Sequence, residues 1–204
     1  MHNLSLTDFT DIAEKNGQQK VTQINKVRRR RKGGYQPQCD FYKKFRQELI
    51  KTHREDHPLS DLDFIVQSLK DRRKIGNYSS AVSEYQAWCK LRFGNKKVVW
   101  FRPPKAEYNH SGVGISVNPE LGLECEGERC VIKLYINKTP LSLLKRNFIS
   151  ELIGTTMRPD LRAEKFGILD VKHRKFYPVD HCDAKIHERI DAELDALAPF
   201  FNNE

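Results

Sequence analysis

A change of hydrophobic period near Gly94 constrains the fold more than any other feature of the sequence. Before this point, apolar residues recur at the spacing of amphipathic helices, as Phe41, Phe45 and Leu49 do. After it, the run at 97–102 carries the β-branched and aromatic residues typical of a strand. This order predicts an α+β fold, in which a helical first half precedes a mixed or antiparallel sheet flanked by helices.

Four helices are expected in the first half, each bounded by residues that start or stop a helix. Ser60 stands three residues before Asp63 and is expected to open the third, which Gly76-Asn77 is expected to close. The four expected ranges are 7–16, 39–54, 60–74 and 79–93.

Short extended runs separated by turn residues follow in the second half. The segment Glu126–Arg129 contains a glycine and is expected to join two of these runs into an antiparallel hairpin. The expected strands are 97–102, 113–117, 121–125, 130–136, 166–171 and 175–179, and the expected helices are 139–154 and 182–198.

The length of 204 residues suits one domain with a small appendage. We expect an N-terminal helix at 1–17, a basic flexible arm at 18–38, a helical subdomain at 39–94 and a sheet subdomain at 95–204. The last two are expected to form one compact unit.

Hydropathy and cysteine usage indicate the compartment. No apolar run approaches the roughly 18 residues of a membrane span, and the first residues do not resemble a secretory signal. The five cysteines are odd in number and scattered, which favours reduced thiols, with a Cys125–Cys130 bridge across the hairpin as the alternative. We therefore expect a cytoplasmic protein that does not associate with membranes.

The positive charge is concentrated in one segment. The formal net charge is +9, from 36 basic and 27 acidic residues. Residues 18–38 contain no Asp or Glu, and without their basic residues the rest of the chain is close to neutral. The seven basic residues of this segment are Lys20, Lys26, Arg28, Arg29, Arg30, Arg31 and Lys32.

A run of five cations followed by Gly33-Gly34 predicts a mobile segment, because like charges repel and glycine disfavours helix. Nucleic acid is the expected partner, since phosphates match the arginine donors and release counterions when they are neutralised. A solvated surface run, an anionic membrane contact and a localisation signal are the alternatives.

From about residue 79 the expected order is helix, three strands, helix, strand. This order, with Pro119-Glu120 on one strand of the hairpin and Lys133 on the next, resembles the PD-(D/E)XK nuclease superfamily. The resemblance implies catalytic residues Glu120 and Lys133, with Glu84 as a further acid, and a divalent Mg²⁺ or Mn²⁺ held by Glu120. The chain departs from the motif at Val131, where the superfamily has a second acid.

A rival match lies further along the chain. Pro159-Asp160 is followed after nine residues by Asp170 and Lys172, at the end of an expected strand. This pair is the alternative catalytic set. It fits the motif better and the element order worse.

A second resemblance covers the chain from about Phe9 to the last helix, through stretches such as 117–124, 131–135 and 168–171. Here the chain resembles a group of bacterial proteins without an assigned function. Together these observations predict a nucleic-acid-binding protein, bacterial or from a mobile element, without robust catalysis. A divergent metal-dependent nuclease and a protein-interaction module that docks on an acidic partner are the alternatives. No cofactor is expected outside the nuclease alternative, and the sequence predicts no oligomeric state.

Overall fold

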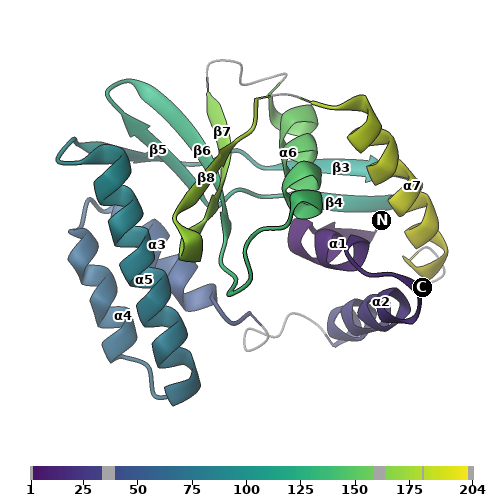
Figure 1. Ribbon diagram of the computed structural model, residues 1–204, viewed down its shortest axis with the longest axis horizontal. Helices are drawn as coiled ribbons and strands as arrows, with labels where there is room; N and C mark the ends of the chain where they lie inside the picture. The colour runs from purple at the N-terminus through teal and green to yellow at the C-terminus, as the bar shows by residue number, and fades with distance from the viewer. Residues whose placement is uncertain (1, 34–39, 159–163, 181, 202–204) are drawn as a thin grey trace.

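A computed structural model describes residues 2–33, 40–158, 164–180 and 182–201 (Figure 1). Its larger sheet has five strands in the order β2-β5-β6-β7-β8. Only β6 and β7 are parallel, and α6 (Leu143–Met157) makes the crossover that a parallel pair requires. The bounds are β2 Val98–Phe101, β5 Leu121–Cys125, β6 Glu128–Tyr135, β7 Lys165–Asp170 and β8 Lys175–Pro178.

The smaller sheet has three strands in the order β1-β4-β3. They are β1 (His2–Ser5), β4 (Val113–Val117) and β3 (Ala106–His110), and β1 pairs parallel to β4 although the two are far apart in sequence. One face of this sheet is apolar and enters the core through Leu4 and Ile115. The polar side chains of Asn3 and Ser116 alternate with these apolar ones, because successive residues of a strand point to opposite faces.

The remaining helices form two groups in Figure 1. The first contains α3 (Lys43–Arg54), η2 (Leu59–Leu62), α4 (Asp63–Gln67) and α5 (Arg72–Phe93). The second contains α1 (Leu6–Ala13), α2 (Gly17–Lys32) and α7 (Ala184–Phe201), which lie with α6 beside the smaller sheet. A short turn, η3 (Val171–His173), connects β7 to β8. None of the described helices has the length and apolar character needed to cross a bilayer.

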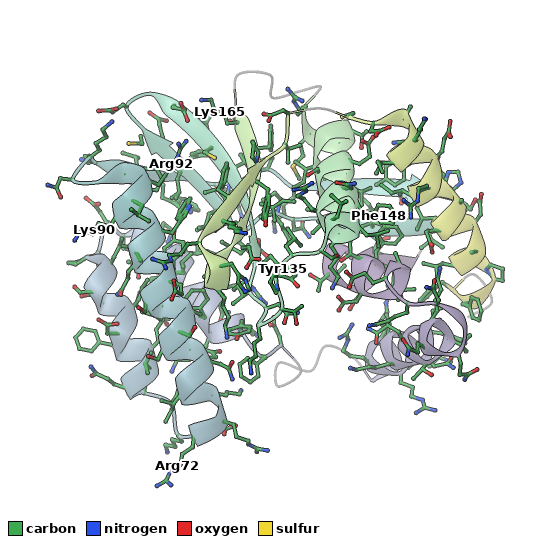
Figure 2. All side chains as sticks on the ribbon, viewed as in Figure 1. Arg72, Lys90, Arg92, Tyr135, Phe148 and Lys165 are labelled. Atoms are coloured by element: carbon green, nitrogen blue, oxygen red, sulfur yellow. The ribbon has the colours of Figure 1, made fainter. Side chains whose placement is uncertain are left out.

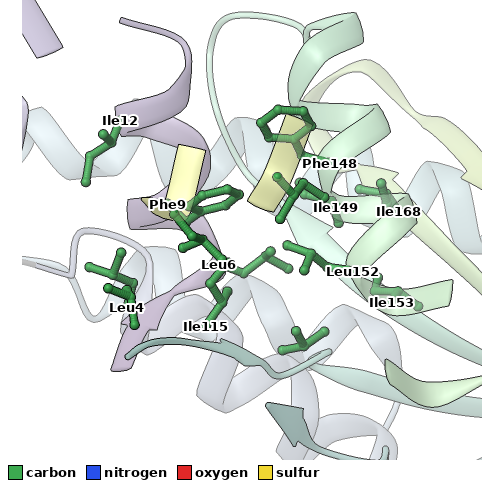
Figure 3. Packing of buried hydrophobic residues seen from close by; sticks show 14 of the residues in the cluster. Leu4, Leu6, Phe9, Ile12, Ile115, Phe148, Ile149, Leu152, Ile153 and Ile168 are labelled. Carbon is green, nitrogen blue, oxygen red and sulfur yellow. The ribbon is translucent and has the colours of Figure 1, made fainter. Parts of the chain in front are cut away.

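The two groups of helices pack on opposite faces of the larger sheet, and each forms a hydrophobic core there. Val131 and Ile168 pack with α1, α6 and α7. Figure 3 shows part of this cluster and labels Ile168 together with residues of α1 and α6. Ile132 and Leu169, their neighbours along the strands, pack with α3 and α5. Alternate residues of β6 and β7 therefore serve two cores, so Lys133 points to the same side as Val131.

The expected α+β fold is confirmed, with a helical first half followed by the sheets. The helix expected at 7–16 is present as α1, at Leu6–Ala13, where Ser5 accepts from the Asp8 backbone N–H and opens the helix. The break expected at Gly76-Asn77 is wrong, because α5 runs through it. A helical glycine costs only about 1 kcal/mol relative to alanine, and α5 is held in place by neighbours such as Tyr78 and Tyr85 in the core.

The flexible arm that the sequence predicts at 18–38 is wrong for Gly17–Lys32, which forms α2. Ile24 and Val27 are buried on one side of this helix. Acids from α1 and α7 lie beside its cations, so the repulsion that was expected to keep the segment unfolded is reduced. Residues 34–38 lie outside the described residues.

Candidate functional site

The seven cations of α2 differ in exposure, since Lys20, Arg28, Arg30 and Arg31 are partly buried and the other three are exposed. Lys20 forms an ion pair with Glu193 of α7, and Arg30 forms one with Asp8 of α1. Arg31 donates to the backbone carbonyl of Asn3 in β1. These contacts hold the helix in place by its inner side.

Lys26, Arg29 and Lys32 are exposed on α2. They are spaced three residues apart, and residues three apart are neighbours on a helix surface. We call these three residues the basic stripe. Because Gly17–Lys32 contains no Asp or Glu, no acid of the same helix offsets their charge.

Glu120 and Lys133 meet where β5 begins. Lys133 Nζ donates to Glu120 Oε1 at 2.6 Å, and the Leu134 backbone N–H donates to Glu120 Oε2 at 2.8 Å. Lys133 Nζ also lies 3.3 Å from the carbonyl oxygen of Asn118. The side chains of Glu120 and Lys133 are 16% and 11% exposed, so the pair is largely shielded from water. The structure thus brings the first two expected catalytic residues together.

Glu84, the further acid expected at this site, forms an ion pair with Arg174 at 2.8 Å instead. The carboxylate of Glu124, on β5, lies 3.8 Å from Arg129. No group of three His, Cys, Asp or Glu residues that could hold a metal ion occurs in the described part of the chain. Both oxygens of Glu120 already accept hydrogen bonds, and among the described residues it belongs to no such group of three, so the residues present do not fit a divalent metal.

Asp170 and Lys172, the rival pair, have separate hydrogen-bond partners. Asp170 is fully buried and accepts hydrogen bonds from the Leu141 backbone N–H at 2.9 Å and from His173 Nδ1 at 2.8 Å. Lys172 instead donates to Asn77 of α5 at 3.0 Å. Both residues therefore connect secondary-structure elements. Asp160 lies outside the described residues.

A cavity of about 720 Å³ connects α2 with the Glu120–Lys133 pair. We call it the α2 cavity. Its lining comes from the N-terminal elements, from the segment around the start of α3 and from the ends of β4 and β6. The lining residues are Asn3, Ser5, Leu6, Thr7, Asp8, Asp11, Arg30, Arg31, Asp40, Phe41, Tyr42, Arg46, Ser116, Asn118, Glu120, Lys133, Leu134, Tyr135, Ile136 and Asn137.

Comparison of the whole sequence with models of known protein families and with curated proteins found no match. The function of the site is therefore inferred from the residues that form it.

Sequence reasoning missed the contribution of β1 and of Asp40–Tyr42 to the α2 cavity. The alternation of Asn3 and Ser5 with Leu4 and Leu6 is the signal that predicts a half-buried strand. No local signal relates this strand to β4, because the pairing joins residues distant in sequence.

A second cavity, of about 510 Å³, lies between α3, α5 and the start of β2. His53 Nε2 lies 2.7 Å from the Tyr85 hydroxyl at its edge, and burial lowers the pKa of His53 to about 4. Burial also raises the pKa of the Cys89 thiol to about 12. At neutral pH the imidazole is uncharged and the thiol is protonated, so this cavity holds no activated cysteine nucleophile.

His187 of α7 joins three elements in a polar network. Its Nδ1 lies 3.2 Å from Glu151 of α6, and its Nε2 lies 3.0 Å from the Tyr108 hydroxyl of β3. Burial and the Asp191 carboxylate raise the pKa of Tyr108, so the hydroxyl remains a donor. The network fixes α7 against α6 and β3.

Proposed function

We propose that the protein binds nucleic acid through the basic stripe of α2, without acting as a robust nuclease. The observation that carries this proposal is the exposure of three α2 cations at regular spacing. Lys26, Arg29 and Lys32 are exposed three residues apart on a helix that Lys20 and Arg30 tie to its neighbours.

A docked helix suits this role better than a flexible arm. A mobile segment must be ordered when it binds, which reduces its net affinity. Ile24 and Val27 already fix α2 against the core, so that cost is lower. Phosphates of a nucleic acid strand are regularly spaced, and cations held at fixed separations neutralise several of them together.

The state of Glu120 supports binding rather than cleavage. Both carboxylate oxygens already accept hydrogen bonds, from Lys133 and from the Leu134 backbone N–H. A Lys133 ammonium paired with a carboxylate is a structural link between β5 and β6. Metal-dependent cleavage by this pair needs a further acid, and Val131 stands where the nuclease superfamily has one.

Binding can be tested by fluorescence anisotropy with labelled DNA and RNA over a range of salt concentrations. The variant Lys26→Gln/Arg29→Gln/Lys32→Gln should bind about tenfold to a hundredfold more weakly than the wild type. The slope of log affinity against log salt should fall by roughly 2 to 3 units, at about 0.7 to 0.9 per phosphate contact.

A charge-matched control separates the stripe from net charge. Lys51, Lys90 and Lys97 are exposed on or beside α3 and α5, and Figure 2 labels Lys90. Lys51→Gln/Lys90→Gln/Lys97→Gln removes the same charge and should leave most of the affinity intact. Equal losses in the two triple variants would reduce the effect to net charge and overturn the proposal, as would a wild-type protein that binds neither DNA nor RNA.

A further inference from the structure

The α2 cavity and the basic stripe share the helix α2. Arg29 belongs to the stripe, and the next residue, Arg30, lines the cavity. A nucleic acid strand several nucleotides long that contacts the stripe can therefore also reach the cavity. The volume of about 720 Å³ lies in the range of small-molecule pockets, about 300 to 1,000 Å³.

The acids that line the cavity are neutralised by neighbouring cations, so the lining does not repel an anion strongly. Each of its four acids is paired with a cation, in the pairs Asp8–Arg30, Asp11–Lys145, Asp40–Arg46 and Glu120–Lys133. A guanidinium carries five N–H donors, so Arg30 has donors beyond the one that its Asp8 contact uses. A phosphate at this wall meets a neutralised surface with available donors.

Aromatic and amide side chains share the same cavity. The Phe41 side chain is 37% exposed, and Tyr135 is half-buried at the end of β6, near the centre of the view in Figure 2. Asn118 and Asn137 are exposed in the lining. Unpaired bases stack on aromatic rings and are read along their edges by hydrogen-bonding side chains, whereas bases within a duplex are already stacked and paired.

We propose that the α2 cavity receives an unpaired nucleotide of single-stranded nucleic acid. The phosphate lies against Arg30, the base against Phe41 or Tyr135, and the base edge meets Asn118 or Asn137. This inference rests on the proposed function and adds a preference for single strands over duplexes.

The test compares a labelled single-stranded oligonucleotide with a blunt duplex of the same sequence, in DNA and in RNA. For whichever of DNA and RNA the wild type binds more tightly as a single strand, it should bind that single strand at least about tenfold more tightly than the corresponding duplex. Phe41→Leu and Tyr135→Leu keep an apolar side chain, and at least one of them should weaken single-strand binding about fivefold or more, since base–aromatic stacking contributes substantially. Unchanged binding in both would overturn the cavity proposal. Duplex binding should stay within about twofold.

A third variant, Asn137→Asp, tests the cavity without altering the core. Asn137 accepts a hydrogen bond from the Thr139 backbone N–H at 3.3 Å, and an aspartate preserves that acceptor. Asn137→Asp should therefore fold normally and weaken single-strand binding by repelling phosphate. Asn95→Asp and Phe64→Leu, at exposed positions outside the cavity lining, are the matched controls and should have little effect.

The outcomes separate the two proposals. Equal wild-type affinity for single strands and duplexes would overturn the cavity proposal and leave the basic stripe standing. Cavity variants that weaken both ligands equally, or a folded Asn137→Asp variant that binds single strands as tightly as the wild type, would also overturn it. Failure of the wild type to bind any nucleic acid would overturn both.

Discussion

Arg30 of α2 forms an ion pair with Asp8 of α1. The two side chains are 35% and 17% exposed, so the contact is partly shielded at the rim of the α2 cavity. It joins the helix that carries the basic stripe to the helix that follows β1. The same arginine thus positions α2 and forms part of the cavity wall.

We expect this ion pair to contribute modestly to stability. A double-mutant cycle of Asp8→Ala and Arg30→Ala, measured by chemical unfolding, should give a coupling free energy of about 0.5 to 1 kcal/mol, because solvent and salt screen partly exposed pairs. The cycle is needed since Asp8 also lies in the first turn of α1 and interacts with its helix dipole. A coupling indistinguishable from zero would show that Arg30 is not held by Asp8 in solution.

The docking of α2 predicts a large effect at Ile24, which is only 2% exposed. Ile24→Ala should lower the free energy of unfolding by about 2 to 4 kcal/mol, because it removes buried methyl groups and leaves a cavity. Thr22→Ala, at an exposed position of the same helix, should change it by less than about 0.5 kcal/mol. Similar small effects at both positions would indicate that the segment behaves in solution as the flexible arm of the sequence prediction.

Burial of His53 predicts a stability that falls on mild acidification. Its pKa is about 4 in the folded protein and about 6.5 when unfolded, so between these values the unfolded chain binds more protons. Stability from this group is present above about pH 6.5 and is lost as the pH falls toward 4, by roughly 2 kcal/mol between pH 7 and pH 5. His53→Gln keeps a hydrogen-bonding group for Tyr85 and should flatten this part of the profile in urea unfolding. A profile unchanged by the substitution would contradict the burial of a neutral His53.

The Glu120–Lys133 pair predicts a structural rather than a catalytic phenotype. Lys133→Met should lower the free energy of unfolding by roughly 2 to 4 kcal/mol, because it leaves a shielded carboxylate without its cation. The double variant Glu120→Gln/Lys133→Met should recover part of that loss. Incubation of the wild type with DNA and RNA in Mg²⁺ or Mn²⁺ should show no robust cleavage. Cleavage that is lost in Glu120→Gln and in Lys133→Ala would instead support the nuclease resemblance.

The elements that the sequence predicts well are those whose local pattern and final environment agree. The β5–β6 hairpin has apolar runs joined by a turn with glycine, and both strands are central and buried. α1 has a serine cap before an apolar face that enters the core. In these segments tertiary contacts reinforce the local preference.

The sequence prediction failed where tertiary contacts outweigh the local pattern. The α2 segment has few apolar residues, and its helix depends on a core and on acids supplied by α1 and α7. The sequence predicts no strand at β3, because this segment and its flanks are rich in Lys, Tyr, Asn, His and Gly. The α2 cavity could not be predicted for the same reason. Arg30, Phe41 and Tyr135 come from separate segments, and only the tertiary fold makes them line one cavity.

The pairing of β1 with β4 also affects the order in which the chain acquires structure during synthesis. The partner of His2 is Val113, about 110 residues later, so β1 leaves the ribosome well before β4 and has no sheet to join until β4 has followed it. Leu4, Phe9 and Ile24 share a core with Ile115, and these apolar side chains stay without that partner in the meantime. Contacts between such distant segments close slowly, whereas α3 to α5 can associate from neighbouring sequence. The N-terminal part, with its basic helix, is therefore made early and completed late.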